Sequence, residues 1–399
     1  MEDCRARISG IAPEIGMLDF LEGPSIAFKQ RLTAMKKLTT PPLSHFHRKL
    51  VPKALLLIGV ALFFCTTRIA IAGDGFNTPG NILIADQFNN RVIEIDPVGL
   101  IVWHFGKGPK NFTAASIVGT NDAERVGVLT LMAGTGIPPG IDPLAPNGVA
   151  DNRVLLVKRE GDIVWQYGHF GVTGSGYDQL NTPVQNTYLP TGNVLITDQG
   201  NQRVIEVTRD KTIVWQYGET GTAGNGPNQL NNPNSAELLK NGHILIADEN
   251  NNRAIEVTHT TPSTIVATFS GTNLPPFPFS GVAFASRLPN GHTLITDSNN
   301  NRIVETDEFG FDFWHYFTNT SKGSNAAPLP TRAVRLATGN TLISDQFNDR
   351  VILVSHSKDI LASYGNINQP GFGRKSVSSG LYAPYSAYEI GDYTGLTPP

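Results

Sequence analysis

Cysteine is almost missing from this sequence of 399 residues. The two cysteines, Cys4 and Cys65, both precede residue 73. Residues 73–399 therefore form no disulfide and hold no thiolate nucleophile or cysteine-bound metal. We expect apolar burial and strand pairing to stabilise this part of the chain without cross-links.

A hydrophobic run long enough to cross a bilayer is also missing. Residues 54–65 are apolar apart from Gly59, and a helix of that length spans about 18 Å, against a hydrocarbon core of roughly 30 Å. Basic Arg48-Lys49 precedes the run, and Ala70-Ile71-Ala72 follows it. This order of basic, apolar and small residues predicts a secretory signal, with its apolar region over 54–65 and cleavage near 72/73.

The chain is therefore divided into an N-terminal extension, residues 1–72, and one domain, residues 73–399. We expect the domain to be secreted or periplasmic, with no membrane contact after cleavage. The alternative is a membrane anchor over residues 54–72, although Arg68 would then lie inside the apolar stretch.

Surplus positive charge is missing from residues 73–399, which contain 21 Lys or Arg and 29 Asp or Glu. Binding to a phosphate backbone needs a clustered basic face, so a net charge of about −8 argues against a nucleic-acid partner.

What the sequence has instead is a repeat with a period near fifty residues. Each copy contains an Asp, a few Asn or Gln, an Arg and an apolar run, as in DQFNNRVIEI from Asp86. Successive arginines are 62, 50, 50, 49 and 48 residues apart. They are Arg91, Arg153, Arg203, Arg253, Arg302 and Arg350. A period of this length with strand-type patterning predicts a stack of similar sheets.

One repeat has room for four strands, and residues 288–317 are its best copy. Asn-Gly and Thr-Gly dipeptides between apolar runs predict tight hairpins, because these residues tolerate positive φ. Each sheet is apolar on both faces and must be covered twice, which radial packing achieves. We predict an all-β fold, a six-bladed β-propeller of four-stranded antiparallel blades.

The two ends of the repeat region indicate how the ring closes. The first repeat begins at its second strand, near residues 81–85, and lacks an inner strand. Residues 384–390 follow the last outer strand and begin with the Pro-x-x-Ala phrase that opens other inner strands. We predict that this C-terminal strand joins blade one and removes the free edge of the ring.

The order strand, Asp-x-x-Asn-x-Arg, apolar strand and aromatic-Gly strand resembles the NHL-repeat β-propellers over roughly residues 78–399. The resemblance implies the propeller fold and leaves the chemistry open, because those propellers include protein- and RNA-binding modules and, with related repeats, lyases and esterases. The tryptophans of the outer strands also resemble those of arylsulfotransferase-like propellers. They are Trp103, Trp165, Trp215 and Trp314.

The repeated carboxylates lie in loops that should share one rim of the ring. They are Asp86, Asp198, Asp248, Asp297 and Asp345. Such a ring of carboxylates could bind a cation such as calcium. The alternative, favoured by the recurrence of one residue in nearly every blade, is that each Asp caps loop N–H groups and pairs with the Arg five residues on. We predict no other cofactor and no dedicated metal site.

The same rim should carry the most variable loops. In blade two the Asp position is Gly134, and the loop from there to Arg153 is fourteen residues longer than in blade six. This insertion is either a ligand-contacting lid or a passive surface loop. The connectors 169–184 and 219–233 belong to the same rim, and we include their Tyr177 and Asn228 in the predicted binding surface.

Candidate catalytic groups are few. Arg125, Arg287 and Arg335 end inner strands and could converge on an anion near the axis. Alternatively, Glu389 pairs with one of them and the others pack against neighbouring blades. His169 opens a rim connector and is the best general-base candidate, and the sequence contains no HExxH pair or GxSxG elbow.

Two functions remain open. The first is a monomeric binding or scaffold module that holds a protein, peptide or glycan on the Asp-loop rim. The second is a propeller enzyme of arylsulfotransferase or lyase type with a His/Arg site at the channel mouth. The absence of a local catalytic motif favours binding, although a site assembled from several blades leaves no such motif.

Overall fold

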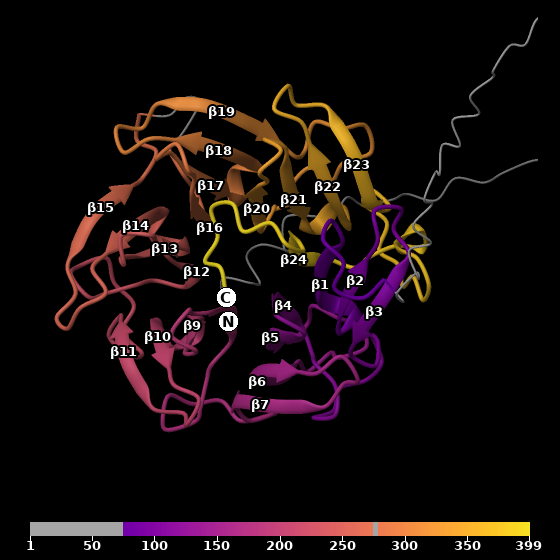
Figure 1. The fold of residues 1–399 in the computed structure, drawn as a ribbon, viewed down its shortest axis with the longest axis horizontal. Coiled ribbons are helices and arrows are strands. Elements are labelled where there is room, and N and C mark those ends of the chain that lie inside the picture. Colours follow the sequence, from indigo (N-terminus) through magenta and orange to yellow (C-terminus); the bar gives the residue numbers. More distant parts are fainter. Residues whose placement is uncertain (1–74, 274–277) are drawn as a thin grey trace, which may run out of the picture. The chain divides into compact units, whose positions relative to one another are not determined.

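The computed structural model describes residues 75–273 and 278–399. They form six four-stranded antiparallel sheets arranged around a central axis (Figure 1). This confirms the predicted propeller. The predicted signal segment, residues 1–72, lies outside the described residues.

In each blade the innermost strand lines the channel and the other three follow it outward. From the channel outward, blade one contains β24 (Pro384–Glu389), β1 (Ile82–Asp86), β2 (Arg91–Ile95) and β3 (Ile101–Phe105). Blade two contains β4 (Thr120–Val126), β5 (Leu129–Ile137), β6 (Val149–Val157) and β7 (Ile163–Gly168). Blade three contains β8 (Pro183–Tyr188), β9 (Val194–Asp198), β10 (Arg203–Val207) and β11 (Ile213–Tyr217).

The second half of the ring repeats the pattern. Blade four contains β12 (Pro233–Leu238), β13 (Ile244–Asp248), β14 (Arg253–Val257) and β15 (Ile265–Phe269). Blade five contains β16 (Val282–Arg287), β17 (Thr293–Asp297), β18 (Arg302–Thr306) and β19 (Asp312–Phe317). Blade six contains β20 (Arg332–Arg335), β21 (Thr341–Asp345), β22 (Arg350–Val354) and β23 (Ile360–Gly365).

Short 3₁₀ turns follow the second strand in five blades. They are η1 (Gln87–Asn89), η2 (Gln199–Asn201), η3 (Glu249–Asn251), η4 (Ser298–Asn300) and η5 (Gln346–Asn348), and η6 (Val377–Ser379) lies in the last connector. Because the strands are antiparallel, these turns and the blade-to-blade connectors share one face of the ring, which we call the Asp-loop face. The tight turns that join the other strand ends form the opposite hairpin face.

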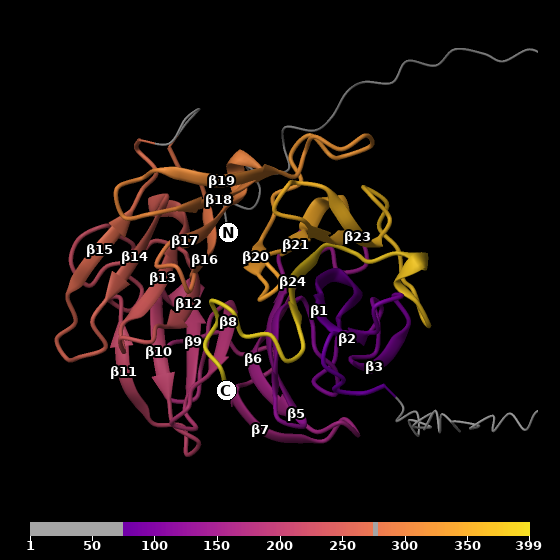
Figure 2. The same cartoon turned by 45° about the horizontal axis from the view of Figure 1, so that its top comes forward.

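Strand β24 closes the ring as predicted. It pairs antiparallel with β1, with Ile82 opposite Glu389 and Ile84 opposite Ala387. The first and last parts of the domain therefore share one sheet, which Figure 2 shows from an inclined view.

Apolar side chains fill the interfaces between blades. One such cluster joins Leu131 and Val154 of blade two to Ile196 and Ile205 of blade three. The four outer-strand tryptophans bridge the same seams, since each indole N–H donates to a backbone carbonyl of the next blade, over 2.8–3.2 Å. These tryptophans therefore hold neighbouring blades together.

Candidate functional site

The repeated Asp carboxylates lie beneath the surface of the Asp-loop face. All five are fully buried. In blade one, Asp86 Oδ2 accepts hydrogen bonds of 2.8 Å from both Arg91 Nε and Asn89 Nδ2, and its Oδ1 accepts one from the Tyr382 backbone N–H. Burial raises the pKa of Asp86, and the Arg91 charge opposes that rise. The pairing of each Asp with the Arg five residues on recurs in all five repeats.

Blade two keeps the same ion pair by another route, which the sequence repeat does not reveal. Arg153 pairs with Asp151, two residues before it, and the Asp151 carboxylate also accepts the Val118 N–H. A Cβ placed on Gly134 would lie 2.5 Å from Asp151 Oδ2, so the glycine leaves the space that this carboxylate fills. Blade two therefore loses the repeated sequence motif but keeps the buried ion pair between an Asp and the repeated Arg.

A second interaction, a hydrogen bond, recurs at every blade boundary. The residue before each repeated Arg has a positive φ, between 50° and 58°, and its side-chain oxygen accepts the N–H of the residue that leads into the next inner strand. The six acceptors are Asn90, Asn152, Gln202, Asn252, Asn301 and Asp349. Asp349 alone among them carries a carboxylate, and it lies at the seam where the ring closes.

The three inner-strand arginines do not converge on the axis. Arg125 pairs with Glu94 at 2.6 Å, Arg287 with Glu256 at 2.9 Å and Arg335 with Glu305 at 3.0 Å. Each Glu lies on the third strand of the preceding blade. The expected anion site is therefore wrong, and so is the alternative pairing with Glu389, whereas the packing of arginines against neighbouring blades is confirmed.

The sequence does contain a signal for these Arg–Glu ion pairs. Where the third strand has Leu in place of Glu, as at Leu156 and Leu353, the next inner strand ends in Tyr188 or Glu389 instead of Arg. The third-strand Glu206 is an exception, because the next inner strand ends in Leu238. Glu206 Oε2 pairs instead with His259 Nε2, at 2.7 Å.

Side-chain alternation explains why these arginines avoid the channel. Successive residues of a strand point to opposite faces, and the sixth inner-strand position lies on the same side as the small fourth position, against the blade. The third and fifth positions line the channel, and second-position side chains join its wall near the Asp-loop face. At the third position they are Asp122, Gln185, Ser235, Phe284, Arg332 and Ser386, and at the fifth Glu124, Thr187, Glu237 and Tyr388.

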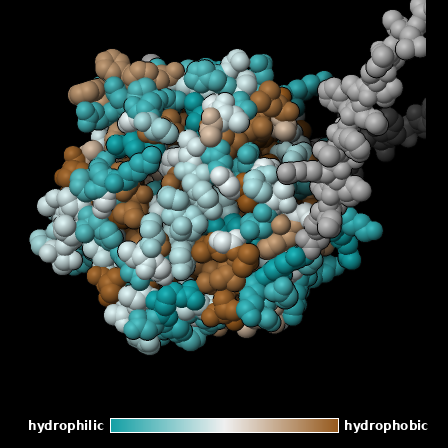
Figure 3. All heavy atoms as spheres, viewed as in Figure 1, coloured by the Kyte–Doolittle hydropathy of each residue, from teal (hydrophilic) through white to brown (hydrophobic). Residues whose placement is uncertain are grey.

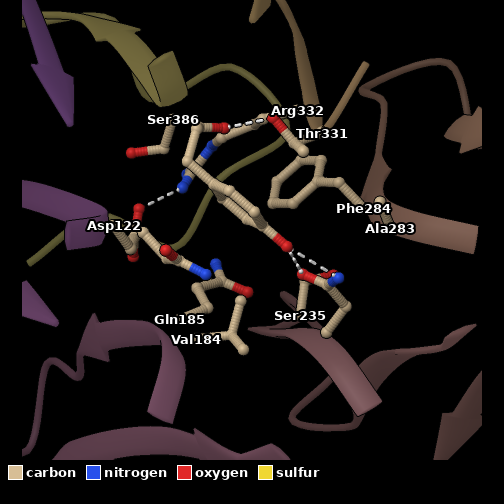
Figure 4. A pocket seen from close by; sticks show the side chains of 12 residues that line it. Asp122, Val184, Gln185, Ser235, Ala283, Phe284, Thr331, Arg332 and Ser386 are labelled. Atoms are coloured by element: carbon tan, nitrogen blue, oxygen red, sulfur yellow. Dashed lines mark hydrogen bonds and ion pairs between the residues drawn. The ribbon is translucent and has the colours of Figure 1, made fainter. Parts of the chain in front are cut away.

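The channel contains more acid than base. Arg332 Nη1 lies 2.6 Å from Asp122 Oδ1, its Nη2 lies 3.9 Å from Glu237 Oε1, and its guanidinium stacks on Phe284 at 4.5 Å. Figure 4 shows Arg332 reaching across to Asp122. Burial raises the pKa of Asp122 and of Glu237, with Arg332 opposing both shifts. Burial also raises the pKa of Glu124 well above its ordinary value, and the charges of Glu237 and Asp122 raise it further.

Amide and hydroxyl groups line the channel near the Asp-loop face. The pocket there has an empty volume of about 200 Å³ that includes space open to solvent, and Asn121, Gln185 and Asn234 contribute to its wall. The Tyr385 hydroxyl crosses from blade one to Asn234 of blade four, at 3.0–3.1 Å. Because side chains span the channel in this way, the space between them suits water-sized molecules.

Aromatic side chains gather around this mouth on blades one, two and six. Phe88 is buried there, and four half-buried rings from separate loops pack around it. They are Phe112, Phe170, Phe347 and Tyr382. The blade-two insertion takes part, because its ends extend β5 and β6 and its Ile141 and Ala145 join the cluster. We call this set the aromatic cluster.

The remaining predicted rim residues differ in exposure and in contacts. Tyr177 is 73% exposed. The Asn228 side chain accepts the Gly218 N–H at 3.0 Å, as Asp178 does for Gly168 in the preceding connector. His169 Nε2 lies 3.0 Å from Asp178 Oδ2, which also binds Lys211 Nζ at 2.6 Å. The imidazole is thus oriented by a carboxylate, outside the channel.

Neither a metal-binding cluster nor a membrane-spanning helix is found in the described residues, 75–273 and 278–399. No three His, Cys, Asp or Glu side chains among them are arranged to hold a metal ion. No helix in the same part of the chain is long and apolar enough to cross a membrane.

No protein-family model matches the sequence, and no curated protein matches it significantly. Several solved structures are similar to it at low identity. A catalytically inactive virginiamycin B lyase from Staphylococcus aureus with quinupristin is 15% identical, with a TM-score of 0.41 over 63% of this chain and 71% of that chain. A protein of unknown function from Bacteroides caccae is 14% identical, with a TM-score of 0.49 over 72% and 93%. The WD40 propeller domain of Doa1 is 14% identical, with a TM-score of 0.43 over 74% and 88%. At these identities and TM-scores the likeness carries no conclusion about function. The sheet order of the structure itself shows that the chain is a six-bladed β-propeller.

Proposed function

We propose that residues 73–399 are a binding module whose Asp-loop face recognises a peptide, a protein segment or a glycan. The observation that carries this proposal is the aromatic cluster beside a channel mouth lined by amides. Rings that are half-exposed and fixed by packing offer rigid contact area, and amides supply directional donors and acceptors.

The alternative of a small-molecule enzyme has less support. The three arginines expected at its site are each used in an ion pair between blades. The channel has space for water-sized molecules between the side chains that cross it. A ligand on the outer face needs neither a large cavity nor a nucleophile.

We further propose that the repeat is of the NHL type and that the domain acts outside the cytoplasm. The first point rests on the Asp-x-x-Asn-x-Arg phrase, whose three polar side chains bind one another as Asp86, Asn89 and Arg91 do. The second rests on the signal-like order of residues 48–72 and on the lack of cysteine after residue 65.

Arrays of printed oligosaccharides and a displayed library of random peptides would test the binding function. We expect saturable binding to one class of probe, weakened at least tenfold by Tyr177→Ala or Leu144→Ala, which change exposed side chains on the Asp-loop face. Phe309→Ala is the matched control, because Phe309 is 67% exposed in a turn of the hairpin face. Equal binding by all variants, or binding to no probe, would contradict the proposal.

A further inference from the structure

The chain continues beyond the strand that closes the ring. Pairing of β24 with β1 is complete at Glu389, and the backbone bonds of Ile390 with Asn81 and Gly80 extend it by one residue. Residues 391–399, which we call the tail, then cross the hairpin-face mouth of the channel. Figure 1 shows the tail at the centre of the ring, and in Figure 3 the centre of this face is filled. Closure of the ring therefore does not account for the tail.

The tail forms hydrogen bonds with three blades other than the one it leaves. Asp392 Oδ2 accepts the Ala337 N–H of blade six at 2.7 Å, and the Tyr393 hydroxyl donates to the Arg125 carbonyl of blade two at 3.2 Å. At the far end, Thr397 reaches Glu237 of blade four. The tail thus lies across the mouth, with contacts near both of its ends.

A Leu-Thr pair fixes the tail in place. Leu396 packs against an apolar group formed by Phe284, Val334 and Leu336. Glu237 Oε2 accepts both the N–H and the hydroxyl of Thr397, at 2.9 and 2.7 Å, and the Thr397 hydroxyl oxygen accepts the Leu238 N–H at 2.9 Å. An apolar recess followed by a carboxylate is a pattern that discriminates one peptide sequence from another.

The groups under the tail have hydrogen-bonding capacity that the tail leaves unused. A space of about 280 Å³, which includes volume open to solvent, lies there, bounded by Glu124, Asn186, Glu237, Leu396 and Thr397 among others. Within the described residues, the buried Asn186 Oδ1 has no hydrogen-bond partner. Glu124 has one backbone donor, the Tyr188 N–H, and no ion-pair partner in the same part of the chain. Unpaired buried polar groups cost stability, so a ligand that reached them would bind better than the tail does.

From these contacts we propose that the hairpin-face mouth of the channel is a peptide-binding site, occupied in cis by residues 391–399 and selective for an extended segment that contains a Leu-Thr pair. The partner is a polypeptide that presents this pair and displaces the tail. The site lies on the face opposite to the Asp-loop surface, so the two proposals stand or fall separately.

A chain that ends at Ile390 tests the site, because it keeps β24. We expect it to bind a fluorescein-labelled Gly-Asp-Tyr-Thr-Gly-Leu-Thr-Pro-Pro peptide, measured by anisotropy, at least tenfold more tightly than the full chain does. The change equivalent to Thr397→Val in the peptide should weaken binding at least tenfold. The matched change equivalent to Thr394→Val should have less than a threefold effect, because the Thr394 hydroxyl makes no hydrogen bond within the described residues. A folded truncated chain that ignores the peptide, or binds the Thr397→Val peptide equally well, would overturn the proposal.

Should the truncated chain fail to fold, the tail can be cut after folding. A protease recognition sequence between Ile390 and Gly391 allows this. Retention of the cut tail through gel filtration, or its exchange for the labelled peptide, supports the site. Release of the tail without uptake of the labelled peptide refutes it.

Discussion

Asp349 replaces an amide with a charge at the seam between blades six and one, and the substitution Asp349→Asn tests what that charge costs. The Asp349 Oδ1 accepts the Ala383 N–H at 3.0 Å, as amide oxygens do at five other boundaries. Burial, with the nearby charges of Asp86 and Asp345, raises the pKa of Asp349 from 3.8 to about 6. Asn keeps the acceptor and removes the charge.

The magnitude follows from the two pKa values. In the folded state Asp349 holds its proton up to about pH 6, whereas in the unfolded chain it loses the proton near its ordinary pKa of 3.8. Stability therefore falls as pH rises between these values, by about 3 kcal/mol in total. A buried amide N–H without a partner costs about 1 kcal/mol. We thus expect Asp349→Asn to stabilise the fold by about 2 kcal/mol above pH 7 and to have no stabilising effect below pH 4.

Urea unfolding followed by tryptophan fluorescence, at intervals from pH 4 to pH 8, gives the difference in unfolding free energy between the two chains. The corresponding rise in melting temperature at pH 8 is about 4 °C. Asn301→Asp, the reverse change at the boundary between blades five and six, is the matched control and should introduce a new loss of stability above pH 6. A free-energy difference between Asp349→Asn and the native chain that stays constant across this pH range would refute the reasoning.

Three further outcomes are expected. Deleting residues 381–399 removes β24 and exposes the edge of β1, so the melting temperature should fall sharply, and an unchanged melt by differential scanning calorimetry would contradict closure of the ring. Arg332→Met should lower the free energy of unfolding in urea by about 3–5 kcal/mol, because Asp122 and Glu237 lose their buried cation. A loss below 1 kcal/mol would show that the two carboxylates are protonated and need no partner. Trp314→Phe should cost about 1 kcal/mol through the lost bond to the His356 carbonyl, whereas Phe309→Ala should stay within about 0.5 kcal/mol.

The sequence predicted the parts of the structure that depend on local repetition. The Asp–Arg pairs could be predicted because both residues lie in one hairpin, five positions apart, and recur in each blade. The closing strand could be predicted because its opening phrase matches other inner strands. The replacement at Gly134 could not, because Asp151 reaches the same space from the partner strand.

The candidate sites were harder to predict, for a geometric reason. The sequence left open whether Arg125 faces the axis or a neighbouring blade, and alternation along the strand turns it toward Glu94 of the preceding blade. The channel lining combines side chains from all six inner strands. Asp122 and Arg332 are 210 residues apart, and no local pattern relates them.

By itself, the sequence determined the number of blades, the four-strand unit and the closure of the ring, because periodic burial and turn chemistry act over short distances. The tertiary structure alone decided which inner-strand side chains face the channel, that the excess acid there shares one arginine, and that the C-terminal residues cover its mouth. These features arise where strands far apart in the chain meet around one axis, and their energies depend on the burial that the closed ring creates.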